Sequence, residues 1–257
     1  MTDQIFFDAD NTSCPNPPPT YTKPCNAFNV SAPAPFTIFY LATIKPHMDT
    51  HTITGPATAF KHLLPAVTDV VSNSPSAIDK LDELQVVEDI WGERTPNDEF
   101  FERGFDTFVV EGQRGVYTVL RILREVNREV HEELPAPVYT VVAVGPLSRT
   151  VSSRATLSRP GLPGKVMGHA AATRVFGSFV AKRDAQEMAR RVMEEMVQGE
   201  VGVKRIEQWE KSGKGGGMLL AMALGVEWVV KIMYDDQVHR RAKEGCDQKG
   251  EEVSWRF

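Results

Sequence analysis

The pentapeptide His-Met-Asp-Thr-His, which starts at His47, combines residue types that can bind a metal ion. In an extended segment alternate side chains point the same way, so both imidazoles and the carboxylate would converge. Many Zn²⁺ and Fe²⁺ sites use two histidines and one carboxylate. We therefore predict His47, Asp49 and His51 as a candidate metal site, with His62 as a further ligand. Acid–base catalysis by one of these histidines and a solvated polar loop are the alternatives.

A second candidate is the segment 148–160, which carries Arg149, Arg154 and Arg159 with hydroxyl residues between them and no acidic residue. Arginines bind phosphate or carboxylate groups through forked hydrogen bonds. We predict an anion-binding or partner-binding surface at these three arginines. A kinase target at Ser152, binding to an acidic helix of the same chain and a solvated loop stay open.

Near the N-terminus, residues 5–12 read Ile-Phe-Phe-Asp-Ala-Asp-Asn-Thr, an apolar run followed by Asp-x-Asp-x-Thr. This resembles the first motif of the haloacid dehalogenase superfamily. The resemblance implies a nucleophile at Asp8, an acid/base at Asp10 and a magnesium ion held by further aspartates, for which Asp235 and Asp236 are candidates. It covers eight residues, and a proline-rich stretch follows where that family continues its doubly wound fold. A phosphatase of this kind is a minor alternative.

Two similar stretches, Gly115 to Ile122 and Gly225 to Ile232, indicate how the chain is organised. In each, a glycine opens a run with strand alternation. One face carries Val116, Thr118, Leu120 and Ile122 in the first run and Val226, Trp228, Val230 and Ile232 in the second, and we expect this face to be covered. The opposite faces, which carry Tyr117, Val119 and Val229, also match in residue type and would be uncovered. We predict an α+β fold that is a tandem duplication of a strand-strand-helix-strand-strand unit. Each unit would form an antiparallel sheet with one helix packed on it.

In the first unit, the pattern predicts strands at 36–42 and 67–72 and an amphipathic helix with an acidic face from Ser74 to Trp91. A hairpin would then join 105–110 to the strand after Gly115.

In the second unit, the pattern predicts strands at 138–144 and 173–180 and a hairpin that joins 218–224 to the strand after Gly225. Between them, helical periodicity is clear at Ala185, Met188, Ala189, Val192 and Met196.

These patterns give four predicted regions. They are a flexible proline-rich N-terminal tail (1–35), a first repeat (36–134), a second repeat (135–236) and a charged C-terminal tail (237–257). The boundary between the repeats is placed at the stiff Pro-Ala-Pro that begins at Pro135.

The composition restricts the class of protein. Hydrophobic residues make up 42% and charged residues 25%, which is typical of globular chains. The net charge of -5 argues against a nucleic-acid partner. No apolar run approaches the roughly 20 residues that span a bilayer, so we expect no membrane segment. Three cysteines without metal-ligand spacing indicate a reducing compartment, and we expect a cytoplasmic or nuclear protein.

The function favoured by these observations is a non-enzymatic protein-interaction or scaffold module, with the basic segment as a contact. It would be a monomeric pseudo-dimer or a homodimer. The alternative is a small-molecule-binding protein or metal-assisted enzyme with a cavity between the repeats, which would use His47, Asp49 and His51. Substrate, cofactor and partner identity stay open at this stage.

Overall fold

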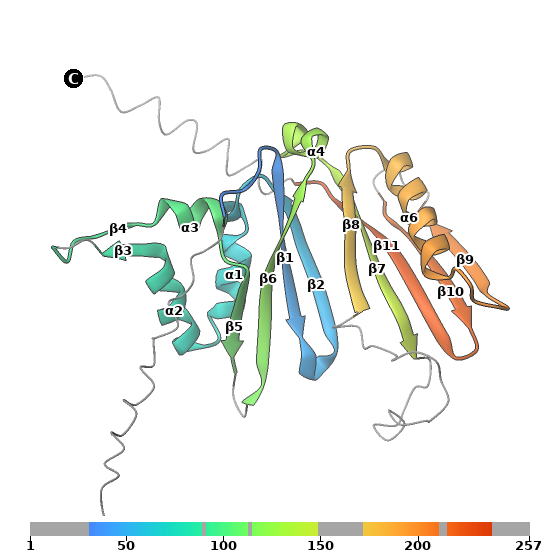
Figure 1. Cartoon of the computed structure of the whole chain (residues 1–257), viewed down its shortest axis with the longest axis horizontal. Helices are drawn as coiled ribbons and strands as arrows, with labels where there is room; N and C mark the ends of the chain where they lie inside the picture. Colours follow the sequence, from blue (N-terminus) through green and yellow to red (C-terminus); the bar gives the residue numbers. More distant parts are fainter. Residues whose placement is uncertain (1–30, 89–90, 113–114, 149–171, 211–214, 238–257) are drawn as a thin grey trace, which may run out of the picture.

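The chain folds into two large antiparallel sheets that lie next to each other, with helices on their outer sides (Figure 1). A computed structural model describes residues 31–88, 91–112, 115–148, 172–210 and 215–237. The predicted α+β class is confirmed. Among the described residues, no helix is long and apolar enough to cross a membrane.

The first sheet has four strands in the order β2-β1-β6-β5. Its strands are β1 (Thr37–Lys45), β2 (Thr50–Ala57), β5 (Thr107–Glu111) and β6 (Tyr117–Val126). Its helices are η1 (Pro46–Met48), η2 (Phe60–His62), α1 (Leu64–Val71), α2 (Pro75–Gln85) and α3 (Asp98–Arg103). A small hairpin of β3 (Val86–Glu88) and β4 (Arg94–Pro96) follows α2.

Phenylalanine dominates the core between the first sheet and its helices. Phe60 is 0% exposed, and its ring meets those of Phe100 and Phe105 edge-on at centroid distances of 5.1 and 5.4 Å. From the sheet side, Leu120 and Ile122 of β6 belong to the same core cluster. These two residues lie on the strand face that the alternation predicts to be buried.

The second sheet has five strands in the order β8-β7-β11-β10-β9. Its elements are β7 (Val138–Ser148), β8 (Thr173–Phe179), α6 (Lys182–Met196), β9 (Lys204–Trp209), β10 (Gly217–Ala223) and β11 (Val226–Asp235). Ala189 and Val192 of α6 pack with Trp228 and Val230 of β11. The helix α6 and the buried face of β11 were both predicted from periodicity.

The two sheets share an order of elements. Each half has a hairpin, a helical segment and a second hairpin, and β1 pairs with β6 just as β7 pairs with β11. A short helix, α4 (Arg128–Glu133), connects the halves. This order agrees with a duplicated unit, but the duplication itself, like the four predicted regions, stays a prediction.

Two predicted elements were wrong. The strand predicted at 67–72 is part of helix α1, whose Val67 and Val71 are buried one helical turn apart. The helix predicted from Ser74 to Trp91 ends at Gln85, and Trp91 is 86% exposed. At 67–72 the β-branched residues favoured a strand, and at Trp91 an apolar residue at helical spacing favoured a longer helix. In both places the packing of the folded chain gives a different structure from the one that the local pattern favours.

The open face of the first sheet packs against β8 and α4. Ile38 and Tyr40 of β1 form an apolar cluster with Val130 of α4 and Val138 of β7. This cluster fixes the two halves to each other at the α4 end of the molecule (Figure 1).

Candidate functional site

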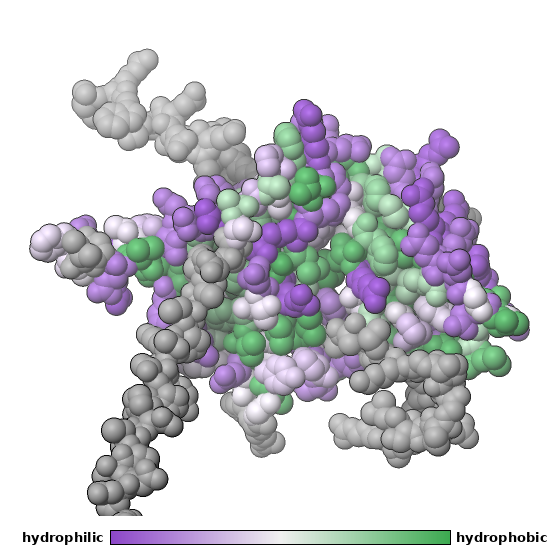
Figure 2. Space-filling view, viewed as in Figure 1, coloured by the Kyte–Doolittle hydropathy of each residue, from purple (hydrophilic) through white to green (hydrophobic). Residues whose placement is uncertain are grey.

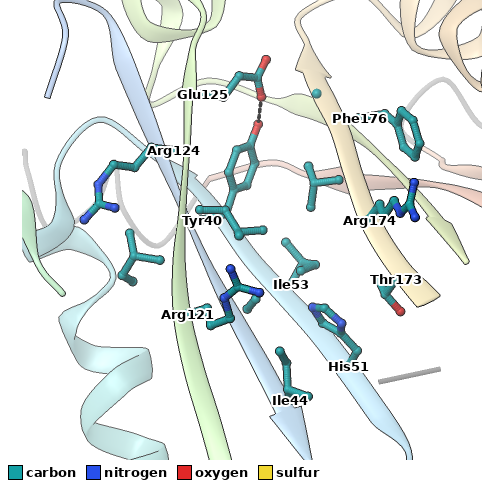
Figure 3. Close-up of a pocket in the computed structure, with 15 residues that line it drawn as sticks. Tyr40, Ile44, His51, Ile53, Arg121, Arg124, Glu125, Thr173, Arg174 and Phe176 are labelled. Carbon is teal, nitrogen blue, oxygen red and sulfur yellow. Dashed lines mark hydrogen bonds between the residues drawn. The ribbon is translucent and has the colours of Figure 1, made fainter. Parts of the chain in front are cut away.

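A cleft of about 650 Å³ lies where the open face of the first sheet meets β8. The surface is hollowed at this boundary, and hydrophobic and hydrophilic residues adjoin there (Figure 2). Strands β1, β2 and β6 form its floor and β8 forms one wall (Figure 3).

The floor has a small residue at its centre. Ala42 of β1 lies opposite Arg121 of β6 on one side and Ile53 of β2 on the other. Its neighbours on the same strand face are Tyr40 and Ile44, because alternate residues share a face. Ala42 is thus ringed by four larger side chains, which leaves a depression between them.

Tyr40 closes one end of the cleft with a hydrogen-bonded network. Its hydroxyl donates to Glu125 Oε2 at 2.6 Å, because a carboxylate can only accept. The hydroxyl oxygens of Tyr40 and Ser178 are 2.9 Å apart, and those of Ser178 and Thr140 are 2.6 Å apart. Burial, followed by the charge of Glu125, raises the pKa of the Tyr40 phenol well above its usual range. Tyr40 is therefore a neutral donor that links the halves.

Asn127 and Gly177 complete this network. The Asn127 amide donates to Glu125 Oε1 and to the carbonyl oxygen of Ser178, both at 2.9 Å. Its Oδ1 accepts from the Val130 amide and so caps α4. Gly177 has φ +132°, and a Cβ there would lie 3.2 Å from Glu125 Oε1. Glycine therefore allows β8 to approach the first sheet closely.

The cleft also has two cationic side chains, Arg121 from the floor and Arg174 from β8 (Figure 3). Within the described ranges, neither makes a hydrogen bond or an ion pair. Arg124 differs from them, because its side chain points away from the cleft and binds Asp106 at 2.6 Å. The only carboxylate that lines the cleft in the described part of the chain, Glu125, already accepts from Tyr40 and Asn127.

The structure does not bring the three predicted metal ligands together. His47 lies in the exposed η1 turn, and Asp49 follows it with a left-handed backbone, φ 51°. His51 is on β2 and lines the cleft. Among the described residues, no group of three His, Cys, Asp or Glu side chains could hold a metal ion. The prediction assumed an extended segment, and the turn at 46–48 breaks that alternation.

Several other candidates lie outside the described residues. They are Arg149, Arg154 and Arg159 of the basic segment, Asp8 and Asp10 of the dehalogenase-like motif, and the three cysteines. Asp235, one of the two suggested magnesium ligands, ends β11, and its carboxylate accepts from the backbone and side chain of Gln237.

Sequence reasoning missed Tyr40, Arg121 and Arg174 as site residues. Arg121 carried a usable signal, because it interrupts the otherwise apolar alternation of Val119 and Leu123 on one strand face. Arg174 gave no such signal, since it lies on an edge strand in an exposed position.

Comparison of the chain with protein-family models, with curated proteins and with solved structures gave no match, so the geometry of the cleft stands alone as a guide to function.

Proposed function

We propose that the protein binds a small anionic molecule with an apolar body in the cleft between its halves. The observation that carries this proposal is the presence in one cleft of about 650 Å³ of two arginines, Arg121 and Arg174, that have no partner among the described residues. That volume is within the range of small-molecule sites.

The charge of the cleft favours an anion. Arginine guanidinium groups bind carboxylate, sulfate and phosphate groups through paired N–H donors. The two arginines outnumber the one carboxylate that lines the cleft among the described residues, Glu125, whose two oxygens accept from Tyr40 and Asn127. Some other surface arginines are paired with carboxylates, as Arg128 is with Glu132 and Arg190 with Glu207.

The remaining lining favours an apolar body. Ile44 and Ile53 contribute from the floor and Val175 from β8. Ala42, which lies opposite Ile53 and two residues before Ile44 on β1, leaves room for a ring or a short chain. Burial of such a group against these side chains would supply the hydrophobic part of the affinity.

Two dyes with the same aromatic body test the proposal. 8-Anilinonaphthalene-1-sulfonate carries one anionic group, and N-phenyl-1-naphthylamine lacks it. We expect saturable fluorescence binding of the sulfonate, with an affinity about three- to tenfold weaker after Arg121→Gln or Arg174→Gln, since both arginines are exposed and partly screened. The neutral dye should bind the wild type and both variants equally.

Arg183→Gln is the matched control, because Arg183 is an exposed arginine on the outer helix α6. It removes the same charge outside the cleft and should leave both affinities unchanged. A second variant, Ala42→Met, fills the floor and should weaken both dyes. The proposal is wrong if the sulfonate does not saturate, or if Arg183→Gln weakens it as much as Arg121→Gln does.

A protein-interaction role, which the sequence favoured first, is supported by a different feature of the described residues. Strand β9 lies at the edge of the second sheet and is exposed.

A further inference from the structure

Strand β9 pairs only with β10 in the described structure, so its other edge carries unpaired backbone groups. Five of its six residues are exposed, and the central Ile206 is 52% exposed. Such an edge is a template for pairing with another strand. We propose that β9 pairs antiparallel with β9 of a second copy of this chain, in a register centred on Ile206, to form one continuous sheet across a two-fold axis.

Symmetry limits the register of such a pair. A two-fold axis perpendicular to the sheet leaves each side chain on its own face of the sheet. Residues directly opposite each other in an antiparallel pair also share a face. Two residues of one strand share a face only if their numbers differ by an even number, so the numbers of two opposed residues must have an even sum. The two-fold axis therefore passes through a residue. Near the middle of β9 this residue is Arg205, Ile206 or Glu207.

The charges of β9 select one of these registers. When the pair is centred on Ile206, Arg205 lies opposite the partner's Glu207, and this contact occurs twice by symmetry. Lys204 then lies opposite the partner's Gln208. A register centred on Arg205 places two arginines opposite each other, and one centred on Glu207 places two glutamates opposite each other. Like charges in direct opposition are destabilising.

The apolar residues agree with the same register. Val229 of β11, Leu220 of β10 and Ile206 of β9 lie opposite one another in a row that crosses the open face of the second sheet. With Ile206 on the axis, this row continues into the partner's Ile206 and Leu220. The pairing would thus cover an exposed isoleucine with its own copy.

Glu207 is already held at this edge. Its Oε2 accepts from Arg190 Nη2 at 3.3 Å and from Trp209 Nε1 at 3.1 Å. Arg205, by contrast, has no hydrogen bond or ion pair within the described part of the chain. The arginine is therefore free to meet a carboxylate supplied by a second copy.

Charge reversal on the full-length chain tests the register. We expect wild-type protein to form a concentration-dependent dimer in sedimentation equilibrium up to about 100 µM. Arg205→Glu alone and Glu207→Arg alone should each weaken the dimer about tenfold or more, because every opposed pair becomes like-charged. An equimolar mixture of the two variants should regain dimers as heterodimers, which native mass spectrometry separates by mass.

Glu207→Arg also removes the contacts with Arg190 and Trp209, so a second pair of variants avoids that change. Ile206→Lys and Ile206→Glu place like charges on the axis when alone and opposite charges when mixed. Circular dichroism melting checks that each variant is folded. A monomeric wild type overturns the proposal, as do single variants that dimerise like the wild type or mixtures that form no heterodimer.

Discussion

The two halves share an order of strands but present different open faces. In the first half this face carries Tyr40, His51, Arg121 and Glu125 around the small Ala42, and it forms the floor of the cleft. In the second half it carries Leu220 and other apolar residues that lead to the exposed edge β9. The first half therefore contributes most of the candidate ligand site, and the second half contributes a wall and a candidate surface for a second copy.

The cores differ as well. Aromatic rings fill the first core, where Phe60 meets Phe100 and Phe105, while alanine and valine of α6 and the buried Trp228 fill much of the second. A similar backbone arrangement can thus be stabilised by different side chains when the total volume and the pattern are kept. What the halves share is the alternation of faces and not the residues themselves.

The largest expected effect on the free energy of unfolding comes from core substitutions, which also test whether the two halves unfold together. Phe60→Ala creates a cavity in the first core and should reduce the free energy of unfolding by about 3–5 kcal/mol. Trp228, 3% exposed in the second core, reports on the other half by fluorescence during urea unfolding when Trp91, Trp209 and Trp255 are replaced by phenylalanine in every variant compared. We expect its transition to shift with that of the whole chain, because Tyr40, Glu125 and Asn127 link the halves.

Met193→Ala is the corresponding substitution in the second core. It should reduce the free energy of unfolding by about 2–5 kcal/mol, and the chain should still unfold in a single transition. If Phe60→Ala leaves the Trp228 transition where it is in the wild type, the halves are independent domains and the linking network has little energetic weight.

Gly177→Ala should have an intermediate effect. The new methyl group needs a left-handed backbone and presses on Glu125 Oε1, so we expect a loss of about 2–3 kcal/mol. Gly225→Ala is matched to it, since Gly225 has φ +85° but nothing lies within 4 Å of an added Cβ. That variant should lose only about 1 kcal/mol. Equal losses in chemical denaturation would mean that the close approach between the halves does not matter.

Tyr40→Phe should have the smallest effect, about 1–2 kcal/mol, because it leaves Glu125 and Ser178 without the phenol. Tyr117→Phe, at a residue 46% exposed on β6, is the control and should change the free energy of unfolding little. The difference between the two losses in the free energy of unfolding is the contribution of the Tyr40 hydroxyl to the contact between the halves, because the Tyr117 hydroxyl is on an exposed residue.

The raised pKa of Tyr40 predicts that the free energy of unfolding depends on pH, and Tyr40→Phe tests this. Since the pKa of Tyr40 is raised in the folded protein, the unfolded chain loses this proton first, near pH 10. The contribution to stability is present below pH 10 and is lost as the pH rises toward the folded pKa. Wild type should lose up to about 1.4 kcal/mol per pH unit from this group, and Tyr40→Phe should show a shallower slope. Parallel slopes in denaturation at pH 9 to 11 would contradict this assignment.

Strong local periodicity explains which elements could be predicted. The buried faces of β6 and β11 and the helix α6 were predicted because their apolar residues repeat with the period of the element. Strand β9 was not predicted, because an edge strand exposed on both faces leaves no alternation in the sequence. Strand β2 was not predicted for a similar reason, since its first half alternates only between exposed and half-buried residues.

The candidate site was less predictable than the fold. The cavity between the halves was foreseen as an alternative, and His51 does line it, but His47 and Asp49 are turned into solvent by a short helical turn. The residues that define the cleft come from β1, β2, β6 and β8, and no spacing along the chain relates them.

By itself, the sequence determined the α+β class and which face of β6, β11 and α6 is buried. Those features follow from local backbone geometry and the burial of apolar side chains. They can be predicted because they give residues close together in the sequence a regular apolar pattern. Only the tertiary structure decided that Tyr40 would meet Ser178, 138 positions away, and that Arg121 and Arg174 would line one cleft. The physical reason is that the cleft depends on how β8 packs over the first sheet, and contacts between distant segments leave no period in the sequence.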